Sequence, residues 1–262
     1  MIGFDVDGDG VATITLDRPE KANALTSEEI ETFVGRLHDV RTDPTIRVAL
    51  ITGAGDRAFC AGMDWNALEE PDLPNTRYYD VPDGLMTNMP AYFKGIDVWK
   101  PIVAAINGHA IALGAHIVLG ADIRIASTNA TIAFSEVLFG DIADGGGIAR
   151  LTRQLPYVHA MDLLLTGRRV AADEMLRMGL VNEVVAPDEL LPRARAIARH
   201  IAVEADPHAV QITKRAVVAS LDVGQTQALQ LEALFKEMLK NRLGDGHDEQ
   251  MLGYSRRFRS GG

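Results

Sequence analysis

The segment PIVAAINGHAIALGAHIVLGADIRIA, residues 101–126, contains the pattern that decides the fold. It opens with a short apolar and β-branched run at 101–106, continues with helical periodicity over 112–121, and ends in a second β-branched run at 123–126. Buried strands separated by a helix are typical of α/β proteins, in which such strands pair in parallel. We therefore predict an α/β fold with mainly parallel strands.

The same segment is also the longest apolar run of the chain, but its composition does not fit a membrane span. Between residues 102 and 121 it is interrupted by Asn107, His109 and His116 and by three glycines, whereas a transmembrane helix needs about 20 predominantly apolar residues. The first ten residues carry several aspartates and no apolar core, so they do not resemble a signal peptide. We predict no membrane partner.

Charge and cysteine content narrow the possible partners. The 262-residue chain has a formal net charge of −10, and nucleic-acid binding requires a concentrated positive face. A single cysteine, Cys60, excludes an internal disulfide and favours a reducing compartment. Neither HExxH nor paired-cysteine spacing is present. We therefore expect a cytoplasmic protein that binds no nucleic acid and no dedicated metal ion.

Working outward, three further runs have strand character: residues 11–16, 47–52 and 181–185. Gly53-Ala54-Gly55-Asp56-Arg57-Ala58 follows one of them and loosely fits a dinucleotide-binding fingerprint. That fingerprint requires a helix to begin at its last small residue. Here Phe59-Cys60-Ala61-Gly62 follows instead, so we predict no nicotinamide cofactor.

Helices are predicted between these strands and after them. Thr26 precedes Glu29 by three positions, a capping-box signal for a helix that runs to about Arg41. Helical periodicity also covers 147–165 and 172–178.

Strand signals end at about Pro187, and the rest of the chain reads as helix. Three helices are predicted, over 188–204, 208–220 and 225–241. The last carries an apolar stripe of Leu231, Leu234, Phe235 and Met238. We predict a core over 1–187 and a helical region over 188–262, which packs either on its own core or on a neighbouring subunit.

Several segments, in this order, resemble the successive signatures of the enoyl-CoA hydratase/isomerase (crotonase) superfamily. They are RPEKANAL (18–25), AFCAGMD (58–64), AINGHA (105–110), ADIRIA (121–126), TGR (166–168) and GLVNEVV (179–185). The resemblance spans nearly the whole chain. It implies a crotonase-type spiral of ββα units over 1–187 that carries the acyl-CoA site. It also implies a helical C-terminal region that serves oligomerisation, in a homotrimer or a dimer of trimers.

The resemblance implies chemistry at the carbon next to a thioester carbonyl. Proton removal there, or addition to an enoyl thioester, places negative charge on the thioester oxygen, which backbone N–H groups stabilise. By resemblance the two donors are the N–H groups of Ala61 and Leu113. The family usually has glycine at the position of Leu113, so the leucine side chain must point away from the thioester.

Three side chains are implied as acid–base groups. Glu136 falls on the position of a catalytic glutamate of the hydratases, and His116 replaces the other one. Histidine, with an unperturbed pKa near ~6.5, is a competent base for water; the alternative is a hydrogen-bonded structural histidine. Asp144 resembles an acidic residue of some isomerases and dehydratases, or it caps the helix that begins in the glycine run. Asp141 is expected on the loop surface.

The remaining site residues are implied to contact the substrate. They are Lys21, Ala22 and Ala24, where the family cradles coenzyme A, and Gly62, Met63 and Asp64 in the second signature. Coenzyme A enters as part of the substrate, and no other cofactor is expected. We therefore predict an enoyl-CoA hydratase/isomerase-type enzyme that stabilises an enolate in an oxyanion hole. The alternatives are an acyl-CoA or β-diketone hydrolase of the same fold, and a non-catalytic acyl-CoA-binding protein.

Overall fold

The computed structural model describes residues 1–64, 67, 98–244 and 252. The chain divides into two compact units, Met1–Glu204 and Ala205–Gly262. This division lies C-terminal to residue 187, where strand signals end. The reason is that helix α6 (Leu190–Glu204) packs on the sheet of the first unit, burying Leu190, Ala194 and Ala198 against its strands.

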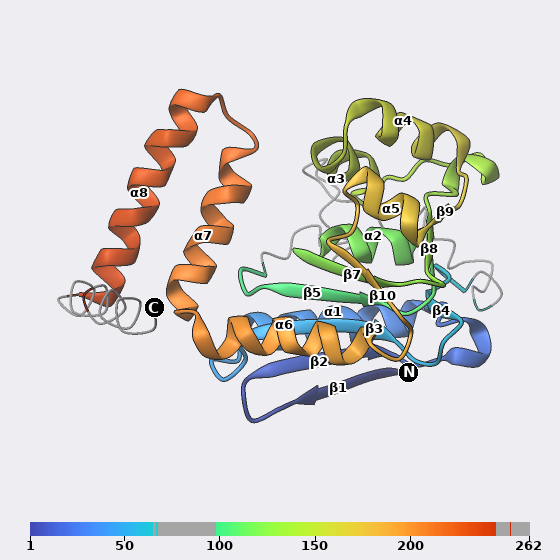
Figure 1. Ribbon diagram of the computed structural model, residues 1–262, viewed down its shortest axis with the longest axis horizontal. Coiled ribbons are helices and arrows are strands. Elements are labelled where there is room, and N and C mark those ends of the chain that lie inside the picture. Colours follow the sequence, from blue (N-terminus) through green and yellow to red (C-terminus); the bar gives the residue numbers. More distant parts are fainter. Residues whose placement is uncertain (65–66, 68–97, 245–251, 253–262) are drawn as a thin grey trace. The chain divides into compact units, whose positions relative to one another are not determined.

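The first unit is built on a six-stranded sheet of mainly parallel strands (Figure 1). Its order is β1 (Ile2–Val6), β2 (Val11–Leu16), β3 (Val48–Gly53), β5 (Ile102–Ile106), β7 (Ile123–Ser127) and β10 (Glu183–Val185). Only β1 pairs antiparallel, with β2. Strands β3 and β5 are buried along their whole length, as expected for a parallel sheet covered on both faces. The predicted α/β fold is confirmed.

A second, four-stranded sheet runs beside the first. It contains β4 (Ala58–Cys60), β6 (His109–Ile111), β8 (Thr131–Ala133) and β9 (Val170–Ala171), of which only β9 pairs antiparallel. Each of β4, β6 and β8 follows a strand of the large sheet after a short turn. Two successive strands followed by helix α2 (Leu113–Gly120) form the ββα unit that the resemblance implied.

The helices follow the predicted pattern with one difference. Helix α1 (Ser27–Thr42) has the capping box of Thr26 and Glu29, and it buries its apolar face in the core. The periodic stretch expected over 147–165 is two helices, α3 (Gly147–Gln154) and α4 (Tyr157–Thr166). Pro156, the residue before α4, separates the two helices. Proline disfavours a helical conformation in the residue before it, so α3 ends before Pro156.

After α5 (Ala172–Met178) and α6, the second unit contains α7 (Pro207–Ser220) and α8 (Gln225–Leu243), which lie side by side (Figure 1). Two residues of the predicted apolar stripe of α8, Leu234 and Met238, are exposed. No helix in the described part of the chain combines the length and apolar character needed to cross a membrane.

Candidate active site

His116 and Glu136, which the resemblance implied at positions 20 residues apart in the chain, meet in the structure. His116 lies on α2 and Glu136 is the first residue of the 3-10 helix η5 (Glu136–Phe139). The imidazole Nε2 is 3.1 Å from the Glu136 Oε1, and the side chains are only 3% and 14% exposed. Within the described residues, the buried Oε2 of Glu136 has no hydrogen-bond partner. A buried carboxylate oxygen without a protein partner is costly unless a ligand or water binds it.

The surroundings of His116 fix the position of its ring. The ring stacks on Phe134 with centroids 6.0 Å apart. Gly147, the first residue of α3, lies so close that a Cβ there would be 2.8 Å from the His116 Nε2. The imidazole therefore occupies space that only glycine at position 147 leaves open.

Asp144 lies in the loop that leads into α3 and is half-buried. Its expected alternative role as a helix cap is wrong, because Gly146 is the N-cap residue of α3 and no side chain caps this helix. The other acidic residue of the loop, Asp141, is exposed as predicted, and its carboxylate accepts a hydrogen bond from the Ile142 N–H.

The predicted oxyanion donor Leu113 is the first residue of α2, and its side chain is buried in the hydrophobic core. The leucine side chain thus packs inward, as the sequence required. Its N–H donates no hydrogen bond to another described residue, as is usual in the first turn of a helix. A helix N-terminus also adds partial positive charge, which favours an anion there.

The other predicted donor, Ala61, is placed differently. Its N–H donates to the Ala22 carbonyl at 3.0 Å, so this amide is already used within the fold. The neighbouring Met63 forms a parallel bridge with Leu25. Leu25 N–H donates to the Gly62 carbonyl and Asp64 N–H donates to the Leu25 carbonyl, both at 2.9 Å. The N–H of Met63 therefore faces away from Leu25, and it has no acceptor in the described part of the chain.

Close backbone contacts bring the Met63 segment to the start of α2. Gly62 has a φ of +107°, and a Cβ there would lie 3.3 Å from the Ile111 carbonyl oxygen. At Gly114, the second residue of α2, a Cβ would lie 2.2 Å from the Cys60 carbonyl oxygen. The sequence motif gave no means to distinguish Ala61 from Met63, because only the hydrogen-bond pattern shows which of the two N–H groups already has a backbone acceptor.

The residues expected to cradle coenzyme A form a tight turn. It begins in the 3-10 helix η1 (Pro19–Lys21) and continues through Ala22 and Asn23, both with left-handed φ values of 52° and 56°. Lys21 is exposed, and Ala22 and Ala24 are half-buried. Asn23 is buried, and its amide donates to the Ala58 carbonyl at 2.7 Å. The turn is thus joined directly to strand β4.

Two other candidate residues, Asp64 and Cys60, have surroundings that indicate a structural role. Asp64 is 7% exposed, and its carboxylate pairs with the Arg18 guanidinium at 2.9 Å. Cys60 is buried, and burial raises the pKa of its thiol to about 12, so it is not a nucleophile. In the described ranges, no group of three or more His, Cys, Asp or Glu side chains is arranged to hold a metal ion.

Known proteins are similar to this chain in sequence and in fold. A family described as enoyl-CoA hydratase/isomerase matches residues 7–253. The (E)-benzylidenesuccinyl-CoA hydratase of Thauera aromatica is 40% identical over 242 residues, 92% of this chain and 90% of that protein. The carnitinyl-CoA dehydratase of Proteus mirabilis (strain HI4320) is 41% identical over 224 residues, 84% of this chain and 82% of that protein.

A solved structure agrees with the sequence relatives. The enoyl-CoA hydratase of Bacillus anthracis superposes with a TM-score of 0.86 at 29% identity, covering 98% of this chain and 96% of that one. Together with the His116–Glu136 pair and the ββα spiral, these similarities show that the chain belongs to the enoyl-CoA hydratase/isomerase family, the crotonase superfamily, and is an enzyme of that type.

Proposed function

We propose that the protein adds water across the double bond of a 2-enoyl-CoA thioester, or catalyses the reverse dehydration. The observation that carries this proposal is the buried pair of His116 and Glu136, whose Nε2 and Oε1 atoms are 3.1 Å apart. Hydration needs a base for water at the β-carbon and an acid for the α-carbon. The two relatives described above, by name a hydratase and a dehydratase, support this direction over double-bond migration.

The pair supplies both proton transfers. Neutral His116 takes a proton from water while the water oxygen bonds to the β-carbon, and the double-bond electrons move onto the thioester oxygen. The enolate then collapses as protonated Glu136 gives its proton to the α-carbon, which completes a 3-hydroxyacyl thioester. One proton then passes from the imidazolium to the carboxylate, directly or through a water molecule, and this restores the starting state; the two groups lie 3.1 Å apart.

We assign the oxyanion hole to the backbone N–H groups of Met63 and Leu113, with Met63 in place of the predicted Ala61. Both amides lack an acceptor among the described residues, whereas the Ala61 N–H is bonded to Ala22. Each such donor contributes ~10²–10³ in rate in enzymes of this chemistry. Donors fixed by strand and helix backbone need no rearrangement as charge develops.

The coenzyme A part of the substrate is proposed to lie on the turn of Lys21, Ala22 and Ala24. The exposed ammonium of Lys21 suits the phosphates of coenzyme A. Gly62 contributes by letting the backbone approach the thioester closely. We propose no cofactor besides the coenzyme A of the substrate. A cytoplasmic location fits the single, buried cysteine.

We further propose a homotrimer or a dimer of trimers. Exposed apolar side chains gather on η5 and α4: Val137, Leu138, Phe139, Tyr157, Val158 and Leu165. We call them the η5–α4 patch. A Cβ placed on Gly167, at the end of α4, would contact the Leu138 side chain on η5, so η5 and α4 are adjacent. An exposed apolar patch of this kind marks a protein interface, and the exposed residues of α8 offer a second one.

The test is the variant Glu136→Gln. It retains size and hydrogen-bonding capacity but cannot donate or accept the α-proton, so turnover with 2-enoyl-CoA thioesters should fall by at least ~10² while ligand binding remains nearly intact. Near-normal turnover in folded variant protein would refute the assignment. A panel of enoyl-CoA chain lengths and aromatic acyl-CoAs identifies the acyl group.

Exchange of the α-hydrogen of a saturated acyl-CoA in D₂O separates the enzyme from its alternatives. The wild-type protein should exchange this hydrogen through Glu136. A hydrolase would release free coenzyme A instead, and a non-catalytic binding protein would do neither.

A further inference from the structure

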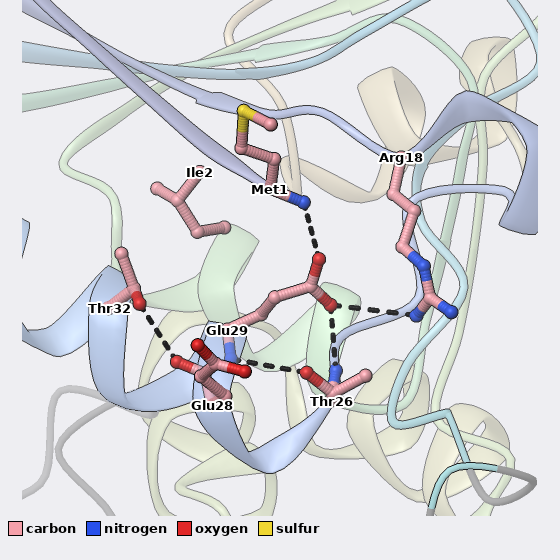
Figure 2. Close-up of a pocket in the computed structure, with 7 residues that line it drawn as sticks. All are labelled: Met1, Ile2, Arg18, Thr26, Glu28, Glu29 and Thr32. Atoms are coloured by element: carbon pink, nitrogen blue, oxygen red, sulfur yellow. Dashed lines mark hydrogen bonds and ion pairs between the residues drawn. The ribbon is translucent and has the colours of Figure 1, made fainter.

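Arg18 lies at the centre of a cluster of carboxylates next to the oxyanion segment. Its guanidinium is 2.9 Å from the Asp64 carboxylate and 3.5 Å from that of Glu29, and it donates to the Ala24 carbonyl at 3.2 Å. Figure 2 shows Arg18 among the residues that line a pocket, with its guanidinium directed toward Glu29, which also contacts Thr26. Arg18 and Asp64 are 20% and 7% exposed, so their attraction is less screened than that of a surface pair.

Asp64 adjoins Met63, whose N–H is the proposed oxyanion donor. The peptide groups on both sides of Met63 bond to Leu25, through the Gly62 carbonyl and the Asp64 N–H. Arg18 contacts both paired segments: its guanidinium forms the ion pair with Asp64 next to Met63, and it donates a hydrogen bond to the carbonyl of Ala24 next to Leu25. The orientation of the Met63 peptide is therefore fixed from one side by residues 18–25.

We propose that Arg18 and Asp64 are positioning residues, whose partly buried ion pair holds the Met63 N–H in line with the thioester oxygen. The inference rests on the proposed function, in which that N–H stabilises the enolate. Neither side chain needs to touch the substrate. Asp64, expected from the sequence to contact substrate, acts instead through the backbone of its neighbour.

The pair also joins substrate binding to catalysis. Residues 18–25 carry the turn proposed for coenzyme A, and they are hydrogen-bonded to 58–64 by Ala22, Asn23 and Leu25. A thioester that fills the turn thus contacts the same structure that orients the donor. Small misplacement of a catalytic group is costly in rate, so the benefit should appear in turnover.

The experiment compares Asp64→Asn with Asp173→Asn as a matched control. Asp173 also pairs with an arginine, Arg177 on α5, at 2.6 Å, but the two side chains are exposed and lie outside the proposed site. Asp64→Asn removes the buried charge with little change in shape. We expect its kcat to fall about 10- to 100-fold, with KM for the enoyl-CoA changed less than about threefold. Asp173→Asn should behave as wild type.

A spectroscopic measurement separates positioning from a general loss of structure. The infrared stretch of a ¹³C-labelled thioester carbonyl in bound saturated acyl-CoA falls when donors polarise the carbonyl. In Asp64→Asn this fall should be reduced, and in Asp173→Asn it should equal that of wild type. Unchanged kcat in Asp64→Asn, or a lower kcat with a full carbonyl shift, would overturn the inference.

Loss of one partner of a buried ion pair destabilises proteins, so a second variant covers the case in which Asp64→Asn does not fold. Arg18→Lys keeps the charge but loses the forked guanidinium geometry, and the same pair of measurements applies. The carbonyl shift needs no turnover. If wild-type protein hydrates no enoyl-CoA, the proposed function fails while the positioning test still gives a result.

Discussion

At the scale of single residues, the reaction depends on which side chain activates water. If it is His116, then His116→Ala should reduce hydration by ~10²–10⁴ but retain α-hydrogen exchange, because Glu136 and both N–H donors remain. Asp144→Asn should then leave hydration largely intact. Both variants are assayed with 2-enoyl and 3-enoyl thioesters. Full hydratase activity in His116→Ala would remove histidine from the mechanism and make Asp144 the better candidate.

Cys60 gives a prediction at the same scale. Its thiol has a pKa of about 12 in the folded protein because it is buried, against about 8.5 in an unfolded chain. The thiol should therefore remain unreactive toward a thiol-specific reagent at pH 8 until denaturant is added. The raised pKa also means that its contribution to stability is complete below about pH 8.5 and declines as the pH rises toward 12. Rapid labelling of native protein would contradict the burial.

Individual residues show which parts of the candidate site can be predicted from the sequence and which cannot. Glu136 and His116 were found by resemblance to motifs, and the structure brings them to 3.1 Å. The choice between Ala61 and Met63 was not available from the sequence, since it depends on which amide pairs with Ala22. The ion pair of Arg18 with Asp64, on which the proposed positioning role rests, was not predicted because the two residues lie in different signatures.

At the scale of elements, α3 begins against the His116 ring. Gly147→Ala would place a methyl group 2.8 Å from both the His116 Nε2 and the Ala143 Cβ. We expect at least a tenfold loss of turnover and a destabilisation of about 1–3 kcal/mol, as for overpacking elsewhere. Chemical denaturation and steady-state kinetics measure the two effects.

Gly35→Ala is the control for that variant. Gly35 lies within α1, and a Cβ there meets no atom within 4 Å. The substitution should leave activity unchanged and, since alanine favours helix over glycine, stabilise the protein by up to about 1 kcal/mol. Full activity in Gly147→Ala would show that the imidazole does not need its present position.

The pattern of elements was predictable where elements are long. The strands of the large sheet other than β1, the capping box of α1 and the C-terminal helices were all expected from the sequence pattern. The second sheet was not, because β4, β6 and β8 have only three residues each, too few to show an alternation. β1 was missed because it contains Gly3 and Asp5, residue types that are uncommon in strands.

At the scale of the whole molecule, the η5–α4 patch predicts self-association. Phe139 alone is 80% exposed, and it follows Glu136 within the same 3-10 helix, so packing there also supports the active site. The protein should run as a trimer or hexamer in light scattering at micromolar concentration.

The variant Phe139→Asp should shift that assembly toward smaller species, because a charge would be buried in an apolar interface. Leu234→Asp on α8 makes the corresponding test of the C-terminal unit. A wild-type monomer at micromolar concentration would contradict the prediction, and an intact assembly in Phe139→Asp would place the interface elsewhere.

The contact between Gly114 and the Cys60 carbonyl predicts which substitutions directed evolution of this enzyme can use. Because Gly114 has no methyl group, the start of α2, which carries the proposed donor Leu113, can approach Cys60 at the end of β4, shortly before Met63 in the chain. In a library of random variants, position 114 should accept no other residue among active clones. Leu113 contributes its backbone and packs in the core, so other apolar residues should survive there. The substitutions that position 114 does not tolerate would therefore report on the geometry that the reaction needs.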